Sequence, residues 1–142
     1  MEPAFWDSSS LVPLCVTQPS TTVVRQLSAQ YGIVVWWSAP VEIRSAFARL
    51  VRTDLLSQAD FAAGQNVLRV LRLNWREVLP SRPLRVEAES FVDRFQLKAA
   101  DAQQLAAAYT WSLGRPSGRV FLSGDEKLPE AARQLGFQAI ET

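Results

Sequence analysis

The sequence has no histidine, one cysteine and no long apolar run, and each absence excludes a class of protein. Without histidine, and with Cys15 as its only thiol, the chain lacks the ligands of an ordinary zinc site and the cysteine pair of an internal disulfide. No apolar stretch could cross a bilayer, and the start, MEPAFWDSSS, lacks the basic and apolar regions of a signal peptide. We therefore expect a cytoplasmic protein without membrane contact, in which any bound metal has oxygen ligands.

A strong net charge is also absent, since 15 basic and 14 acidic residues leave a formal charge of +1. The whole molecule therefore exerts no strong nonspecific attraction on nucleic acid. The chain does have 48% hydrophobic and 20% charged residues, which is typical of a globular core. Its 142 residues fit one domain, and no repeat or polar linker marks a second, so we expect a single domain over 1–142.

Short apolar runs of strand character alternate with helical patterns along the chain. The runs are AFW (4–6), IVVWW (33–37), EVL (77–79), RVFL (119–122) and FQAI (137–140). Between them, apolar residues recur at helical spacing, in a first pattern ended by Gly32 as its cap and in later ones opened by Pro40, by Ser57 with Asp60, and by Pro83. This alternation predicts an α/β fold, a three-layer sandwich around a central, mainly parallel five-stranded sheet.

Four acidic residues fall at the carboxyl edge of this predicted sheet. Asp7 follows the first strand, Glu42 lies in the first turn of the helix after the second, and Asp125 follows the strand 119–122. Asp101 lies near the start of the helix before that strand. Because this helix runs antiparallel to the strands, its first turn should meet the same edge, where ligands of open α/β sheets bind.

Each acid taken alone has an ordinary structural explanation, except one. Asp7 is placed to cap the short helix that follows it, Glu42 to complement a helix dipole, and Asp125 to form a turn or cap. Asp101 is harder to explain, because helical spacing puts it on a packed line with Leu105. Carboxylates about 6 Å apart repel by roughly 3 kcal/mol at an effective dielectric near 20, so four together take up protons or hold a cation. Oxygen ligands favour Mg²⁺ or Mn²⁺.

Four short motifs, in this order, resemble those of the PIN-domain ribonucleases, and within them the VapC-type toxins of bacterial toxin–antitoxin pairs. The motifs are an Asp followed by a hydroxyl residue (Asp7, Ser9), a Glu opening a helix (Glu42), an L-x-x-x-D-A helix start (Leu97, Asp101, Ala102) and a Thr/Ser-x-Asp after a late strand (Ser123, Asp125). The resemblance spans nearly the whole chain. Gln104 departs from it, because many relatives have a histidine there, and any role of that histidine is absent here.

The resemblance implies a PIN-like fold and an Mg²⁺- or Mn²⁺-dependent endoribonuclease that hydrolyses RNA phosphodiester bonds. One or two ions that activate water would be held by Asp7, Asp101, Asp125 and, in an assisting role, Glu42. Ser9 and Ser123 would support the carboxylates, with a plain turn or cap role as the alternative. Such proteins usually form homodimers and are inhibited by a cognate antitoxin, so RNA, an antitoxin and a second copy are the expected partners.

Two other functions fit parts of the sequence. A receiver-type signalling domain also places acids at the carboxyl end of a parallel sheet and binds Mg²⁺. It needs a phospho-acceptor aspartate at the end of its third strand, whereas the only acid near that place, Asp54, follows a helical run. A PIN fold kept as a noncatalytic binding module is the other alternative, and the intact acids argue against it.

Two further groups of residues fit either a structural or an RNA-binding interpretation. Adjacent strand residues point to opposite faces, so we expect Trp36 and Trp37 in the core, with stacking of one of them on a base as the alternative. Arginines at helical spacing either form solvated faces or guide RNA. They are Arg69, Arg72 and Arg76 in one set and Arg44, Arg49 and Arg52 in the other.

Overall fold

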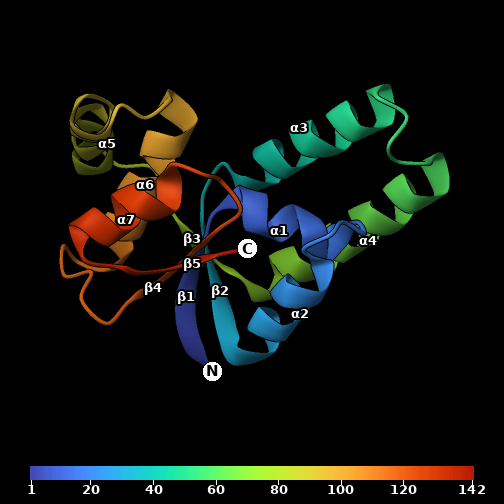
Figure 1. The fold of residues 1–142 in the computed structure, drawn as a ribbon, viewed down its shortest axis with the longest axis horizontal. Coiled ribbons are helices and arrows are strands. Elements are labelled where there is room, and N and C mark those ends of the chain that lie inside the picture. The colour runs from blue at the N-terminus through green and yellow to red at the C-terminus, as the bar shows by residue number, and fades with distance from the viewer.

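Five parallel strands form the centre of the computed structural model, which describes residues 1–142 (Figure 1). They are β1 (Glu2–Trp6), β2 (Tyr31–Trp36), β3 (Arg76–Val78), β4 (Val120–Ser123) and β5 (Gln138–Glu141). Their order across the sheet is β3-β2-β1-β4-β5, and every neighbouring pair is parallel. All five predicted runs are therefore strands, and the predicted α/β class is confirmed.

Seven helices cover the two faces of the sheet and complete three layers (Figure 1). They are α1 (Ser8–Cys15), α2 (Thr21–Gln30), α3 (Ala39–Arg52), α4 (Gln58–Asn74), α5 (Arg82–Phe95), α6 (Ala99–Trp111) and α7 (Leu128–Leu135). One core, with Phe5 and Phe121, lies against α5, α6 and α7, and the other, with Trp6 and Leu122, lies against α1 to α4. Since strand neighbours enter opposite cores, both faces of the sheet are buried, which explains the continuous apolar runs.

Most predicted helix boundaries are confirmed. Ser57 accepts a hydrogen bond from the Asp60 N–H at the start of α4, and Gly136 ends α7 with a φ of 111°. Pro40 and Pro83 lie in the first turns of α3 and α5, where a missing N–H costs nothing. None of the seven helices combines the length and apolarity needed to cross a membrane.

Two local predictions are wrong. Gly32 does not cap α2, because Tyr31 already has an extended backbone (φ −122°, ψ 133°) and the chain passes directly into β2. Arg76 does not share a helical face with the arginines before it, because α4 ends at Asn74 and Arg76 opens β3. In both places a strand begins earlier than the periodicity indicated.

The strand order argues against a receiver domain. Receivers have the order 2-1-3-4-5, whereas this sheet has 3-2-1-4-5. Asp54, the acid nearest to a phospho-acceptor in sequence, is exposed in a turn after α3 and ends no strand. The structure therefore has neither the strand order of a receiver domain nor a phospho-acceptor aspartate at the end of its third strand.

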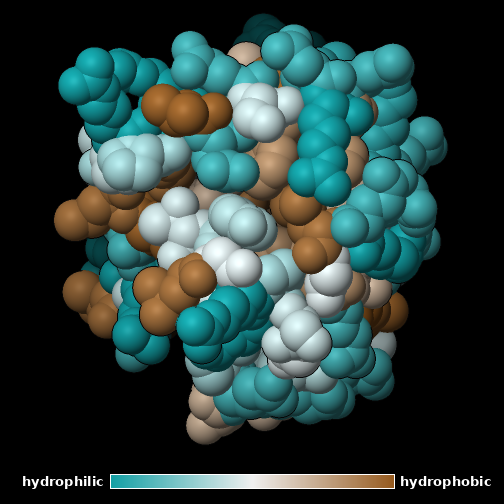
Figure 2. Space-filling view, turned by 90° about the vertical axis from the view of Figure 1, so that its left-hand side faces the viewer, coloured by the Kyte–Doolittle hydropathy of each residue, from teal (hydrophilic) through white to brown (hydrophobic).

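The surface over α5, α6 and α7 carries only small apolar groups. Figure 2 shows this face, on which hydrophobic side chains stand in separate groups among hydrophilic ones. Val86 and Val92 of α5 and Leu113 after α6 are among the exposed apolar residues of the chain. This face has no broad continuous patch of the kind that marks a large buried interface.

Candidate functional site

One cavity, called the acidic cavity below, collects all four predicted acids at the carboxyl edge of the sheet. It has a volume of about 500 Å³ and is lined by Asp7, Glu42, Asp101 and Asp125. Asp7 follows β1 and Asp125 follows β4, while Glu42 and Asp101 lie in the first turns of α3 and α6. Arg49 is the only cationic residue of the lining, so negative charge dominates it.

Asp7 is the buried centre of this cavity, with only 4% of its surface exposed. It stands at the N-cap of α1, but its side chain makes no capping hydrogen bond, so the capping interpretation is wrong. Instead, Asp7 Oδ2 accepts hydrogen bonds from the hydroxyls of Ser9 and Ser123, the latter at 2.9 Å. The pKa of Asp7 is raised to about 6, because burial and, to a smaller extent, repulsion from Glu42 and Asp101 outweigh the lowering effect of these two bonds.

The two serines also fix the loop after β4. Ser123 Oγ accepts a hydrogen bond from the Asp125 N–H at 3.0 Å, and Ser9 Oγ accepts one from the Gly124 N–H at 2.9 Å. A Cβ at position 124 would lie 3.3 Å from Thr142 Oγ1 and 3.5 Å from the Ser9 carbonyl oxygen, so glycine permits this close approach. Each serine therefore connects β1 to β4 across the edge of the sheet.

Asp125 has a capping role as well as a place in the cavity. Its Oδ2 accepts hydrogen bonds from the backbone N–H groups of Lys127, at 3.2 Å, and Leu128, at 3.0 Å, at the start of α7. The cap interpretation thus holds for this acid. The capping bonds fix the carboxylate through one oxygen and leave Oδ1 without a hydrogen bond.

Glu42 is held by two side chains that sequence reasoning did not assign. The Ser8 hydroxyl donates to Glu42 Oε2 at 2.6 Å, and Gln104 Nε2 donates to the same oxygen and to Ser8 Oγ, the latter at 2.9 Å. Gln104 is 1% exposed, and its Oε1 is buried without a hydrogen-bond partner. Position 104, where many PIN-domain relatives have a histidine, therefore still has a role, because the side-chain amide of Gln104 orients Glu42. Its spacing of three residues from Asp101, on one helical face, was the clue in the sequence.

Electrostatic repulsion links the four acids to one another. Burial raises the pKa of Glu42, and repulsion from Asp101 adds to it, while hydrogen bonds from Ser8 and Gln104 lower it. Burial also raises the pKa of Asp101, together with repulsion from Asp125 and against the attraction of Lys98. A proton or a cation bound near any one of these carboxylates therefore relieves the others.

The donor chemistry of the acidic cavity fits a hard divalent cation. No three acidic side chains are arranged to hold a metal ion in this conformation. However, every potential ligand in the lining is an oxygen or an amide, with no thiol or imidazole, and three of the four carboxylates have pKa values raised by burial and mutual repulsion. Mg²⁺ keeps several water ligands, so carboxylates that reach it partly through water suit it.

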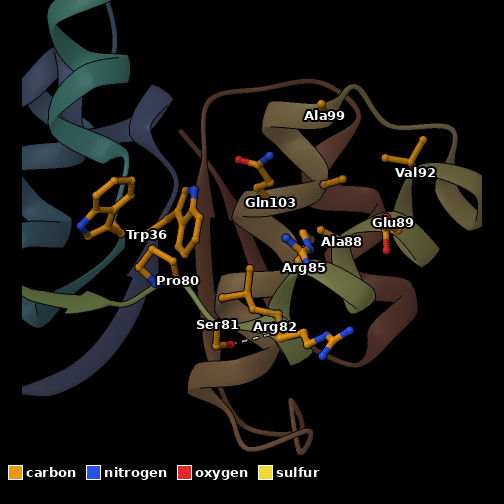
Figure 3. A pocket seen from close by; sticks show the side chains of 13 residues that line it. Trp36, Pro80, Ser81, Arg82, Arg85, Ala88, Glu89, Val92, Ala99 and Gln103 are labelled. Carbon is orange, nitrogen blue, oxygen red and sulfur yellow. Dashed lines mark hydrogen bonds between the residues drawn. The ribbon is translucent and has the colours of Figure 1, made fainter.

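A second cavity, called the tryptophan cavity below, is lined in part by the first turn of α6 (Figure 3). It has a volume of about 650 Å³, and its lining includes Trp36, Trp37 and Gln103. The expectation that both tryptophans lie in the core is confirmed for Trp36, which is 6% exposed, and is wrong for Trp37, which is 53% exposed. β2 ends at Trp36, so the alternation of a strand does not bury its neighbour.

The predicted arginine faces divide between two places. Arg44, Arg69 and Arg72 line a groove of about 620 Å³ between α3 and α4. Arg49, of the same helix as Arg44, belongs to the acidic cavity instead. A continuous basic track from the predicted spacing is therefore not formed.

Comparisons with known proteins identify the fold. No family model matches the sequence, and no curated protein matches it. Two solved structures are similar over nearly the whole chain. PAE2754 from Pyrobaculum aerophilum is 18% identical with a TM-score of 0.68, and the match covers 99% of this chain and 89% of that one. FitAcB from Neisseria gonorrhoeae is 16% identical with a TM-score of 0.63, over 97% and 96% of the two chains. PIN-domain proteins of the VapC type have this fold, as predicted.

Proposed function

We propose that this chain is a divalent-metal-dependent endoribonuclease that hydrolyses RNA phosphodiester bonds. The observation that carries the proposal is the meeting of four carboxylates, from four separate segments, in one cavity at the carboxyl edge of a PIN-like sheet. Four independent caps or turn residues would have no reason to converge there. The likeness of the fold to FitAcB, a PIN-domain toxin, supports the further proposal that the chain is the toxin of a toxin–antitoxin pair. That it acts as a homodimer is a proposal that rests on the resemblance of the sequence motifs alone.

The metal of the proposed site is Mg²⁺ or Mn²⁺, because its ligands are oxygen atoms. The residues that would hold it are Asp7, Glu42, Asp101 and Asp125. When bound, a divalent ion supplies charge stabilisation at the phosphate and lowers the pKa of water.

Hydrogen bonds within this protein orient three of the four carboxylates. Ser9 and Ser123 hold Asp7 through one oxygen, and the start of α7 holds Asp125 in the same way. Glu42 depends on Ser8 and Gln104 for its orientation. Such hydrogen bonds limit the rotation of these three carboxylates, so less conformational freedom is lost when they bind a metal ion.

Cleavage of a broad RNA panel tests the proposal. The panel contains transfer RNA, ribosomal RNA and single-stranded RNA, and is incubated with purified protein and Mg²⁺ or Mn²⁺. We expect cuts that disappear with a chelator and that fall on the order of ten-thousandfold in Asp7→Asn and Asp101→Asn, the range seen when a catalytic group is removed. Asp93→Asn, on an exposed part of α5, is the matched control and should cut normally. An RNA panel left intact with both ions would refute the catalytic proposal.

A noncatalytic binding module is the second candidate, favoured by the lack of three acids already arranged around one point. Calorimetric titration with Mn²⁺ separates the two. Binding to the wild type that Asp7→Asn abolishes supports the nuclease, whereas a protein that binds RNA but no divalent ion supports the module. Growth arrest on expression, relieved by a neighbouring gene, would test the toxin role.

A further inference from the structure

We infer that the tryptophan cavity binds one unpaired nucleobase of the RNA substrate, beside the phosphate received by the acidic cavity. The inference rests on the proposed function, since it assigns a specificity subsite for the same substrate. It follows from the position of this cavity, from the unpartnered buried donor of Trp36, one of the residues that line it, and from the charges around it.

The first turn of α6 contributes residues to both cavities. Asp101 lines the acidic cavity, whereas Ala99, Ala102 and Gln103 line the tryptophan cavity. At about 100° per residue, Ala99 and Gln103 lie about 200° around the helix from Asp101, on its opposite side. On the other wall, β2 leads through Trp37 directly into α3, whose first turn carries Glu42. A single strand of RNA with a phosphate in the acidic cavity therefore has a neighbouring nucleotide within reach of the tryptophans.

The two indoles offer stacking surface to a base. Trp37 is 53% exposed although it lines a cavity, so a large aromatic ring is left in contact with water. Its ring centroid is 6.5 Å from that of Trp36, and the planes are inclined by 64°, so the two rings are not stacked on each other. Stacking of unpaired bases on aromatic side chains is the usual way in which proteins bind splayed-out RNA.

Trp36 has a buried donor that no group of the protein satisfies. Its Nε1 has no hydrogen-bond partner, and the residue is 6% exposed. Two other tryptophans are satisfied, since Trp6 Nε1 donates to the Gly32 carbonyl oxygen at 3.3 Å and Trp75 Nε1 donates to Glu77 Oε2 at 2.9 Å. Native proteins rarely leave such a donor unpaired, and the ring nitrogens and carbonyl oxygens of bases are acceptors.

The rim of the tryptophan cavity is positively charged, which attracts the RNA phosphates. Arg82 and Arg85 extend from the first turn of α5, and Glu89 is the only acid in the lining. Ser81 caps this helix by accepting a hydrogen bond from the Leu84 N–H at 3.2 Å, so the positive end of the helix dipole points the same way. Figure 3 shows Trp36 on one side of the cavity and the α5 and α6 side chains, among them Arg85 and Gln103, on the other. An aromatic wall facing arginines suits a nucleotide.

The test measures RNA binding without cleavage, in the Asp7→Asn background with a chelator. The probe is a single-stranded RNA of about twelve nucleotides, together with versions that carry one abasic nucleotide at successive positions. We expect Trp37→Ala to weaken binding about ten- to hundredfold, and Trp37→Phe to retain most of the affinity. Leu55→Ala, at an exposed apolar residue of the turn after α3 that lines none of the cavities described, is the matched control and should bind normally.

The decisive measurement is whether the effects of Trp37→Ala and of an abasic nucleotide on RNA affinity are coupled. In the protein that retains Trp37, one abasic position should weaken RNA binding as much as Trp37→Ala does. In the Trp37→Ala variant, the same abasic position should cause no further loss of affinity. Arg85→Gln should reduce the salt slope by about one, whereas Arg25→Gln, on α2, should leave it unchanged. The inference is overturned if no abasic position is coupled to Trp37, or if Trp37→Ala dissociates a dimer while RNA affinity stays the same.

The outcomes also separate this inference from the proposed function. If the wild type cuts no RNA but coupling to Trp37 is found, the proposed function alone fails. If the wild type cuts RNA but no position is coupled, the base subsite alone is wrong. In the supported case, the cut sites of Trp37→Ala should lose the base preference that the wild type has at the coupled position.

Discussion

The acidic cavity and the tryptophan cavity are both lined in part by the first turn of α6, and they leave different groups unsatisfied. In the acidic cavity Asp7, Glu42 and Asp125 accept hydrogen bonds, and the unfavourable feature is charge, because burial and mutual repulsion raise the pKa values of Asp7, Glu42 and Asp101. In the tryptophan cavity the unfavourable features are an exposed indole and the unpaired Nε1 of Trp36.

This difference indicates two kinds of ligand. A cation relieves crowded carboxylates, whereas a flat molecule with acceptor atoms relieves an exposed ring and an unpaired donor. Substitutions that change one cavity should therefore leave the other intact. The predictions below test this separation, starting with the largest expected effect.

The largest effect on stability separates the two adjacent tryptophans. Trp36→Ala should lower the free energy of unfolding by about 3–5 kcal/mol, because it leaves a cavity beside the core formed by α5, α6 and β2. Trp37→Ala should cost less than about 1 kcal/mol, because half of this ring is already in water. Urea unfolding of both variants checks this. Equal losses would mean that both rings are structural, and would remove the reason to assign one of them to a ligand.

A second effect follows from the raised pKa of Asp7. In the unfolded chain this carboxyl has a pKa of 3.8, and in the folded protein about 6, so between these values the folded state holds more protons. The contribution of Asp7 to the stability of the metal-free protein should therefore be fully present below about pH 4, decrease as the pH rises to about 6, and then level off, with a total change of about 3 kcal/mol.

Asp7→Asn should remove most of this slope. At pH 7 in a chelator, the variant should be about 1–3 kcal/mol more stable than the wild type, since it avoids a buried charge but rearranges the bonds from Ser9 and Ser123. Mn²⁺ should then stabilise the wild type and not the variant. Urea unfolding from pH 4 to 7 gives both results, with Asp93→Asn as the control that should keep the wild-type slope. A less stable Asp7→Asn protein would contradict the view that this carboxylate is held at a cost in stability.

The sequence was sufficient for the features that depend on short-range order and on sheet geometry. Five apolar runs became five strands, and the carboxyl ends of parallel strands necessarily meet at one edge. That rule alone placed Asp7 and Asp125 together. The phase of the helices then brought Glu42 and Asp101 to the same cavity, because each lies in the first turn of a helix that begins at this edge.

The features that the sequence did not predict depend on long-range packing or on a single boundary residue. Gln104 and Glu42 are 62 positions apart, and their hydrogen bond exists only because α6 and α3 approach each other at the sheet edge. No local pattern encodes that distance. The exposure of Trp37 depends on where β2 ends, and a difference of one residue moves the indole from the core to the surface.

The smallest predicted effect concerns Gln104, which touches Glu42 and lies beside neither tryptophan. Gln104→Met keeps the volume of the side chain and removes its donor, so Ser8 alone would hold Glu42. We expect Mn²⁺ affinity and RNA cleavage to fall about 10- to 100-fold, as is usual when the partner of a ligand is lost. Because the lost hydrogen bond lowers the pKa of Glu42, the acidic limb of the pH–rate profile should move to higher pH.

Gln104→His and Gln65→Met complete this test. Histidine can donate a hydrogen bond in place of the amide, so Gln104→His should recover most of the lost Mn²⁺ affinity, whereas Gln65→Met, on α4 away from both cavities, should behave as the wild type. RNA binding in a chelator should be the same for Gln104→Met and the parent protein, because the tryptophan cavity is unchanged. If Gln104→Met instead weakens metal-free RNA binding as strongly as Trp37→Ala does, the first turn of α6 transmits changes between the cavities, and their separation is wrong.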